Sequence, residues 1–272
     1  MAKAVMIGYP LLEKKWVNSF NYWIQKYNPN NLFLPLSVKN EDLSLVLKAL
    51  PKMGFDSVVA DISSSKEILK YMDLWSNEAH ITQSVTVVSF EKDGKVRGHN
   101  FMGESFIENI IQNNFKFEFY GKTAVILGTG ASAKAVGCSL LKKDLEKIYF
   151  VSRHTDNALE NIKALKGPVC VLDWNQKEEI LPKADILVNA TPLGMKGLDD
   201  LKINMSLLKN SCLVCDLVYL PAKTFFVKEA TLRGLPVLDG LSLLLQQARM
   251  SFQFCYGILP DIDSSVREIA EG

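Results

Sequence analysis

The chain has 272 residues, of which 48% are hydrophobic and 22% charged, a balance typical of one large or two modest globular domains with a real core. Lys plus Arg (31) nearly equals Asp plus Glu (30), so no basic excess indicates a nucleic-acid partner. No apolar stretch is long enough to span a membrane. We therefore expect a small-molecule substrate, no nucleic acid and no membrane, with either a monomer or a homodimer possible.

The first residues and the cysteines favour a cytoplasmic protein. The apolar run within residues 1–8 is too short for a secretory signal peptide. Five cysteines, an odd number scattered through apolar segments, fit a reducing compartment better than a disulfide framework. Cys212 and Cys215 form a lone Cys-x-x-Cys with no second ligand pair at a plausible spacing, so we expect them to pack and predict no metal site.

The first hundred residues alternate between strand and helix patterns. The predicted strands are 3–8, 32–38, 57–62, 84–90 and 95–99. Two predicted helices are 16–27 and 67–75. A third lies between them; Asn40 is expected to cap it, and it runs to Leu50. Lys92-Asp93-Gly94 separates the last two strands, which predicts an antiparallel hairpin.

After Gly103 the alternation becomes more regular. The predicted helices are 104–112, 131–142 and about 241–256, and the predicted strands are 123–127, 147–153, 169–172, 185–190, 212–218 and 236–238. Near-continuous apolar strands linked by helices indicate a parallel sheet that is covered on both faces.

A glycine-rich loop follows the first strand of this second half. Gly128 permits a tight turn, Gly130 lets the backbone approach a diphosphate, and Ala133 allows helix and strand to pack closely. The helix that begins at Ala131 and Ser132 presents backbone N–H groups and a positive dipole end to an anion. These features predict a bound dinucleotide.

The end of the next strand indicates which dinucleotide binds. Residues there are Ser152-Arg153-His154 rather than an acid. A guanidinium suits the 2′-phosphate of NADP, and neighbouring polar groups add hydrogen bonds, whereas NAD or S-adenosylmethionine sites generally carry an acidic residue here. We therefore expect NADP as the cofactor.

These patterns predict an α/β fold with two domains. Residues 1–103 plus 241–272 form an N-terminal α/β substrate-binding domain, and residues 104–240 form a C-terminal Rossmann-type NADP-binding domain. We expect the final helices to return to the first domain and the substrate to bind in a cleft between the two domains.

The second half resembles the shikimate dehydrogenase family, whose members reduce 3-dehydroshikimate with NADPH. The matching segments are the glycine loop, Ser152-Arg153-His154, Asn189-Ala-Thr-Pro-Leu-Gly-Met195, Asp216-Leu-Val-Tyr-Leu-Pro221 with Thr224, and Asp239-Gly-Leu241 with Gln247. The resemblance implies substrate contacts by Tyr219 and Gln247. It implies further cofactor contacts by Ala190, Thr191, Leu217, Gly240 and Leu243.

The first half keeps several landmarks of that family's sequence but differs at the positions of its substrate-binding and catalytic residues. Gly8-Tyr9-Pro10 matches the family's opening Gly-x-Pro, but the two serines that hold the substrate carboxylate fall on Lys14 and Trp16. Lys14 could pair with a carboxylate by another geometry. Aligned through Gly54-Phe55, the family's catalytic Lys falls on Ser65, and Lys66 lies one residue late.

The family's acidic catalytic residue is also missing. Thr86 replaces an Asn, Asn100 is retained, and the Asp position holds Met102. Hydride transfer to a ketone needs a proton donor near the forming alkoxide, and Met102 cannot serve. The remaining candidates are Lys66, Asp61, His99 and Tyr219. Asp61 and Lys66 could form a new acid–base pair or merely a strand-end ion pair. We expect His99 to be a strand-end surface residue.

Three functions remain open from the sequence. The first is an NADP-dependent oxidoreductase of shikimate dehydrogenase type that acts on an altered small polar cyclic or keto-acid substrate. The second is a catalytically inactive nucleotide-binding homologue that serves as a sensor or partner subunit. The third is a true shikimate dehydrogenase in which a bulge shifts Lys66 into the site.

Overall fold

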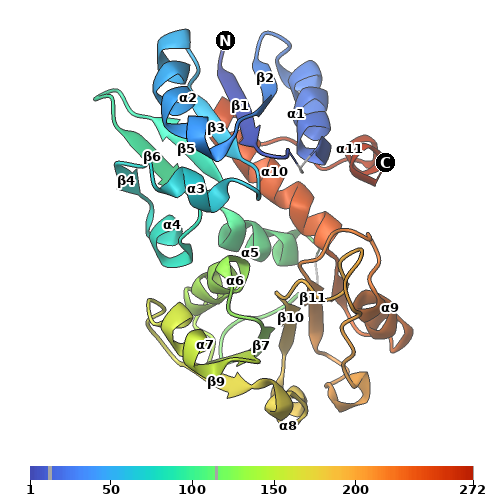
Figure 1. Ribbon diagram of the computed structural model, residues 1–272. Coiled ribbons are helices and arrows are strands. Elements are labelled where there is room, and N and C mark those ends of the chain that lie inside the picture. The colour runs from blue at the N-terminus through green and yellow to red at the C-terminus, as the bar shows by residue number, and fades with distance from the viewer. Residues whose placement is uncertain (12–13, 114–115, 272) are drawn as a thin grey trace. The chain divides into compact units, whose positions relative to one another are not determined.

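The computed structural model describes residues 1–11, 14–113 and 116–271. The chain divides into two compact units, residues 1–102 with 245–272 and residues 103–244 (Figure 1). The second unit ends at Leu244, within helix α10 (Gly240–Tyr256), rather than at the expected residue 240. Among the described residues, no helix is long and apolar enough to cross a membrane.

The first unit is built on a mixed sheet with the strand order β2-β1-β3-β5-β6-β4. Strand β1 pairs in parallel with β2 and β3, while β5 pairs antiparallel with β3 and β6. The predicted hairpin is therefore confirmed. The strands are β1 (Lys3–Gly8), β2 (Leu32–Ser37), β3 (Ser57–Ala60), β4 (Leu74–Trp75), β5 (Val87–Phe90) and β6 (Val96–His99).

Short helices join these strands, and two sequence predictions about them are wrong. Helix α3 ends at Leu69, not at Trp75, because Asp73 exchanges hydrogen bonds with the backbone of Val96 and draws β4 onto β6. Asn40 caps no helix; it begins a 3-10 turn, and the N-cap of α2 is Asp42. The helices here are α1 (Lys14–Tyr27), α2 (Leu43–Ala49), α3 (Ser65–Leu69), α4 (Asn77–Thr82) and α11 (Ser264–Glu271).

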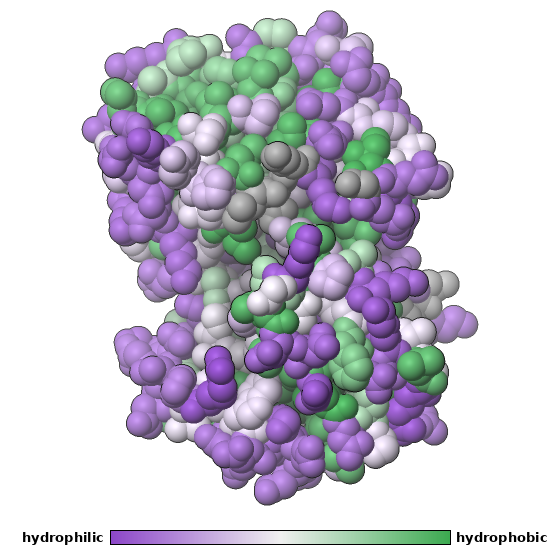
Figure 2. Space-filling model, turned by 45° about the vertical axis from the view of Figure 1, so that its right-hand side comes forward, coloured by the Kyte–Doolittle hydropathy of each residue, from purple (hydrophilic) through white to green (hydrophobic). Residues whose placement is uncertain are grey.

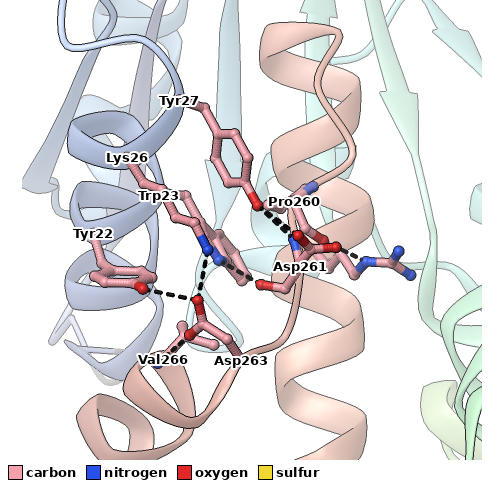
Figure 3. A network of polar contacts seen from close by, with 9 residues as sticks. Tyr22, Trp23, Lys26, Tyr27, Pro260, Asp261, Asp263 and Val266 are labelled. Atoms are coloured by element: carbon pink, nitrogen blue, oxygen red, sulfur yellow. Dashed lines mark hydrogen bonds and ion pairs between the residues drawn. The ribbon is translucent and has the colours of Figure 1, made fainter.

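Helix α1 and the carboxyl-terminal segment are joined by aromatic packing and by a polar network (Figure 3). The ring of Phe20 lies 4.3 Å from that of Phe33 and 5.3 Å from that of Phe252 on α10. Asp263 accepts hydrogen bonds from Lys26 Nζ at 2.7 Å and from the Tyr22 hydroxyl at 2.8 Å (Figure 3). These contacts fix residues 245–272 within the first unit.

The second unit contains a parallel sheet with the strand order β12-β11-β10-β7-β8-β9, the order of a doubly wound dinucleotide-binding fold. The predicted Rossmann-type architecture is thus confirmed. The strands are β7 (Thr123–Leu127), β8 (Lys147–Ser152), β9 (Val169–Asp173), β10 (Ile186–Asn189), β11 (Leu213–Asp216) and β12 (Val237–Leu238).

Alternate residues of these strands face opposite layers. Val125 and Val214 pack in one cluster with Phe226 of α9, whereas Phe150 faces Gly137 of α6. A Cβ at Gly137 would lie 2.5 Å from the Phe150 ring, so the absence of a side chain there brings α6 close to the sheet. The helices are α5 (Met102–Gln112), α6 (Ala131–Leu141), α7 (Thr155–Ile162), α8 (Lys177–Ile180) and α9 (Phe225–Leu232).

Hydrophilic side chains cover much of the visible face of each unit, with hydrophobic side chains between them (Figure 2). Exposed apolar side chains include Leu45 at 70% and Leu232 at 82%. Such isolated residues are normal on a globular surface and indicate no particular function.

Candidate active site

The glycine loop after β7 is shaped by close backbone approach. Gly128 has a φ of +103°, which side chains rarely adopt, and its N–H donates to the Val151 carbonyl at 2.8 Å. A Cβ on Gly128 would lie 3.0 Å from the Ala190 carbonyl oxygen, whereas nothing lies within 4 Å of one on Gly130. Gly128 therefore joins the ends of β7, β8 and β10, and Gly130 leaves an open approach to the backbone.

Helix α6 starts at this open position. Its first internal hydrogen bond runs from the Lys134 N–H to the Gly130 carbonyl at 3.0 Å, so the N–H groups of Ala131, Ser132 and Ala133 precede any acceptor within the helix. Ala133 is fully buried, while Ala131 and Ser132 are partly exposed. A helix start with unsatisfied donors beside a bare glycine suits a diphosphate.

The turn after β8 presents a cationic side chain. Ser152 Oγ accepts a hydrogen bond from the His154 N–H at 3.2 Å, which holds the turn. Arg153 and His154 are exposed, and within the described parts of the chain the Arg153 guanidinium makes no hydrogen bond or ion pair. The five donors of this group are therefore available for a phosphate.

Asn189 and Asp216 end adjacent parallel strands and share a buried hydrogen-bond network. Asn189 Nδ2 donates to Asp216 Oδ1 at 2.9 Å and to the Leu193 carbonyl at 3.0 Å. Its Oδ1 accepts from both the N–H and the hydroxyl of Thr191, at 3.1 and 2.7 Å. The predicted cofactor contacts Ala190 and Thr191 thus lie on a loop that Asn189 shapes.

The carboxylate of Asp216 organises a second loop. It accepts from the Val218 N–H at 3.0 Å and from the Thr224 hydroxyl at 2.6 Å, and Thr224 in turn caps α9. Burial raises the pKa of Asp216 to about 6. This segment carries Leu217 and Tyr219, both partly exposed. The motif match marked these residues, but the network that joins them follows from strand pairing.

Helix α10 begins against that segment. A Cβ on Gly240 would lie 2.2 Å from the Val218 carbonyl oxygen, so no other residue fits without moving the backbone. Leu243 is almost fully buried, at 3% exposed, and Gln247 further along the helix is partly exposed. The cofactor contact of Leu243 and the substrate contact of Gln247 stay predictions.

In the first unit, Asp61 sits at the end of β3 and is fully buried. A Cβ on Gly8 would lie 2.5 Å from the Cβ of Asp61. Asp61 Oδ1 accepts from the Ser63 N–H at 2.9 Å, and Ser63 Oγ accepts from the Tyr9 N–H at 3.0 Å. Asp61 therefore shapes the turn that leads from β3 to α3.

The two lysines and the serine predicted near this turn differ in their surroundings. Lys66 is exposed on α3, and Ser65 Oγ donates to the Ile62 carbonyl at 3.2 Å. Lys14 begins α1, but its side chain lies outside the described residues. Trp16, at the position of a family serine, is 5% exposed and stacks on Phe20 at 6.2 Å. That position has become part of the aromatic core.

The side-chain amide of Asn100 makes its hydrogen bonds within the protein. Its Nδ2 donates to Thr82 Oγ1 at 3.1 Å and to the Ser84 carbonyl at 3.0 Å, and its Oδ1 accepts from the Met102 N–H at 3.0 Å. Both amide hydrogens are occupied, so Asn100 has no donor left for a substrate. Thr86 Oγ1 accepts from the Phe101 N–H at 3.0 Å and thereby holds the same loop.

His99 is half-buried rather than a surface residue, which corrects the sequence expectation. Its Nε2 lies 3.1 Å from Ser89 Oγ, and its ring stacks on Phe101. Burial lowers the pKa of His99, which favours the neutral imidazole. Phe101 and Phe254 pack with His99, although the sequence motifs marked neither of them. The spacing of Phe254, two helical turns after Gln247 on the same face of a helix, was the one pattern that indicated such a neighbour.

Met102, which the sequence resemblance aligns with the family's acidic catalytic residue, lies at the start of α5 and is 8% exposed. Among the described residues, no group of three or more His, Cys, Asp or Glu side chains could hold a metal ion. All five cysteines lie in the described part of the chain and none forms a disulfide.

Comparison with known proteins decides the family. A shikimate dehydrogenase (NADP(+)) of Dinoroseobacter shibae is 32% identical over 268 residues, which cover 98% of this chain and 96% of that protein. The chain belongs to the shikimate dehydrogenase family. Its residues 109–217 match the family model for shikimate / quinate 5-dehydrogenase. A relative of the same name from Paracoccus denitrificans is 34% identical over 97% of this chain and 94% of its own length.

Solved structures agree with this family. Shikimate dehydrogenase of Thermus thermophilus, solved with NADP(H) and shikimate, has a TM-score of 0.84 at 25% identity, over 99% of this chain and 98% of that one. A 5-ketofructose reductase of Gluconobacter has a TM-score of 0.87 at 22% identity, covering 99% and 98%, and shares the fold. The chain is accordingly an NADP-dependent dehydrogenase that acts on CH–OH groups.

Proposed function

We propose that this family member interconverts a carbonyl and an alcohol on a small cyclic or keto-acid substrate other than shikimate. The observation that carries the proposal is Met102, an almost buried thioether where the family has its catalytic acid. A thioether neither donates nor accepts a catalytic proton. Ser65 at the lysine position supports the same conclusion, because a substrate held by the usual Lys–Asp pair would find neither group.

The second unit supplies a cofactor site that fits NADP. The loop from Gly128 to Gly130 and the start of α6 would hold the diphosphate, and Arg153 with Ser152 and His154 would hold the 2′-phosphate. The open space at Gly130, where nothing lies within 4 Å of an added Cβ, leaves room for a diphosphate against the backbone. When bound, NADPH supplies the hydride that converts a carbonyl into an alcohol.

We assign proton donation to Lys66. It is exposed on α3 and can carry an ammonium proton to the forming alkoxide. Asp61 supports it as a positioning residue, because its carboxylate holds the Ser63 N–H in the turn immediately before α3. Tyr219, Gln247, Lys14, Ser65 and Thr86 are the proposed substrate contacts; Asn100 is left out because both of its amide hydrogens are bonded within the protein.

A panel of cyclic ketones and keto acids tests the proposal through NADPH oxidation. Turnover with one of them, lost in Lys66→Ala, is the expected result. Calorimetry that shows tight NADPH binding while every carbonyl remains unreacted would overturn the enzymatic proposal and favour an inactive nucleotide-binding homologue. Absence of nucleotide binding would contradict both.

A true shikimate dehydrogenase is the second candidate. Curated relatives that are 30–34% identical over nearly the whole chain carry the name shikimate dehydrogenase (NADP(+)). In this alternative Lys66 takes the place of the family lysine. Rapid shikimate-dependent reduction of NADP⁺, lost in Lys66→Ala, would establish it and exclude the altered substrate.

We also propose a cytoplasmic location, which the absence of disulfides among the five cysteines supports. The oligomeric state, monomer or homodimer, is measurable by light scattering of the purified protein.

A further inference from the structure

Three rings meet at the carboxyl end of strand β6 in the first unit. The ring centroid of Phe254, on α10, lies 4.6 Å from that of His99 and 5.3 Å from that of Phe101. The His99 and Phe101 rings are nearly parallel, at 8°, while Phe254 is inclined by 49° to Phe101. We call these three residues the ring cluster.

The ring cluster is not part of the closed core. Phe254 is 39% exposed, and Phe101 and His99 are partly exposed. In contrast, Phe252 of the same helix is fully buried. The ring cluster therefore keeps apolar ring surface accessible, although burying a phenyl ring would be favourable by about 1.5–3 kcal/mol.

Two polar groups of the ring cluster are engaged within the protein. His99 Nε2 contacts Ser89 Oγ at 3.1 Å, and the backbone N–H of Phe101 donates to Thr86 Oγ1 at 3.0 Å. These bonds fix the two neighbouring rings. A hydroxylated ring packed on the phenyl faces of Phe101 and Phe254 would lose hydrogen bonds to water that those faces cannot replace, which is unfavourable.

Two links connect the ring cluster with the proposed site: sequence neighbourhood at Phe101 and a shared helix at Phe254. Phe101 directly precedes Met102, the residue at the family's acid position. Phe254 lies two turns, about 10 Å, beyond Gln247 along α10 and on the same helical face. Helix α10 therefore carries both a proposed substrate contact and a ring of this cluster.

We propose that the substrate carries a flat apolar group, an aromatic or conjugated ring, that packs on Phe101 and Phe254. This inference rests on the proposed function, since it concerns the substrate of the same site. The substrate class is then a cyclic ketone or keto acid with an aromatic ring, rather than a ring bearing several hydroxyl groups. Aromatic groups favour offset or edge-to-face contact with such rings.

Ligand-detected saturation-transfer NMR and NADPH oxidation test this with the full-length protein. The probes are tetralone, a ketone fused to a benzene ring, and a hydroxylated cyclohexanone, each added with saturating NADP⁺ for the binding measurement. We expect tetralone to bind more tightly. Phe254→Ala should weaken tetralone binding roughly tenfold and Phe254→Leu only about twofold to threefold, because leucine keeps bulk but not the ring.

Tyr120→Ala is the matched control, because it removes an exposed ring (84%) from the second unit. It should leave tetralone binding unchanged. Equal binding of the two ketones, or a Phe254→Ala protein that folds normally and binds tetralone as well as the unsubstituted protein, would overturn the inference. Tetralone binding with no NADPH oxidation by any ketone or keto acid of the panel would refute the proposed enzymatic function alone. Turnover of the hydroxylated ketone only would refute the ring preference alone.

Discussion

Asn189 Nδ2 donates a hydrogen bond to Asp216 Oδ1 at 2.9 Å, and both side chains are buried at the ends of adjacent parallel strands. Through this bond the loops that follow β10 and β11 share one support. Each loop carries residues proposed to contact the cofactor or the substrate. The rigidity of the cofactor side of the site therefore depends on two side chains that are not themselves proposed to contact either ligand.

Removal of Asn189 should destabilise the fold. Asn189→Ala leaves the Thr191 hydroxyl without its acceptor and the Leu193 carbonyl without its donor, and we expect a loss of about 2–4 kcal/mol in the free energy of unfolding. Urea denaturation measures it. Asn175→Ala, at an exposed position, is the control and should change stability little. If Asn189→Ala lowers the free energy of unfolding no more than Asn175→Ala does, the hydrogen-bond network does not stabilise the fold.

The raised pKa of Asp216 predicts a pH dependence of stability. Its pKa is about 6 in the folded protein against an ordinary value of 3.8, because burial penalises the charged form. The folded state thus binds the proton more tightly, so this group's contribution to the free energy of unfolding is largest below about pH 4. That contribution falls by about 2–3 kcal/mol as the pH rises to about 6 and is constant above. Asp216→Asn should remove this fall.

Denaturation of both proteins at a series of pH values from 4 to 7 tests the sign. Asp200→Asn, which alters an exposed carboxylate, should retain the slope of the unsubstituted protein. If Asp216→Asn retains it too, another group is responsible.

Two glycine substitutions distinguish the effect of backbone strain from the effect of steric contact at the glycine loop. Gly128→Ala and Gly234→Ala both place a side chain at positive φ, +103° and +74°, but only the former adds a Cβ 3.0 Å from the Ala190 oxygen. We expect Gly234→Ala to lose about 1 kcal/mol of stability with unchanged NADPH affinity, and Gly128→Ala to lose more stability and about tenfold in affinity. Calorimetric titration with NADPH distinguishes them; equal affinities would argue against a diphosphate at this loop.

Arg153 should determine the preference for NADPH over NADH. Its exposed guanidinium has no partner among the described residues, so replacement removes a phosphate contact and little stability. We expect Arg153→Ser to weaken NADPH binding about tenfold to hundredfold and to leave NADH binding nearly unchanged. Lys166→Ser, an exposed lysine of the same unit, is the control for general loss of positive charge. A parallel loss for both nucleotides would place Arg153 away from the 2′-phosphate.

Lys66→Ala should lower kcat by about a hundredfold to ten-thousandfold, because the alkoxide loses its proton donor. The KM for NADPH should not change. Lys48→Ala alters an exposed lysine on α2 and should retain full activity. An unchanged kcat would transfer the role to another residue of the site.

The sequence alone determined the cofactor half of this protein. A buried strand, Gly128, Gly130 and a helix of small residues form a local pattern, and Arg153 follows at the end of the next strand, so the parallel sheet and NADP could both be predicted. The motifs also predicted the family. Such features depend on short-range periodicity and on the special conformations of glycine, which a linear sequence displays directly.

Only the tertiary structure decided what lies beside these motifs. Leu74–Trp75 became a strand instead of the end of a helix because it pairs with β6, more than twenty residues away. Asn100 became a loop support, and Asn189 and Asp216 became partners, through hydrogen bonds across the fold. The ring cluster of His99, Phe101 and Phe254 brings together segments about 150 residues apart. Local propensity carries no information about such contacts, because they arise only when the strands have found their order and the last long helix has returned to the first unit.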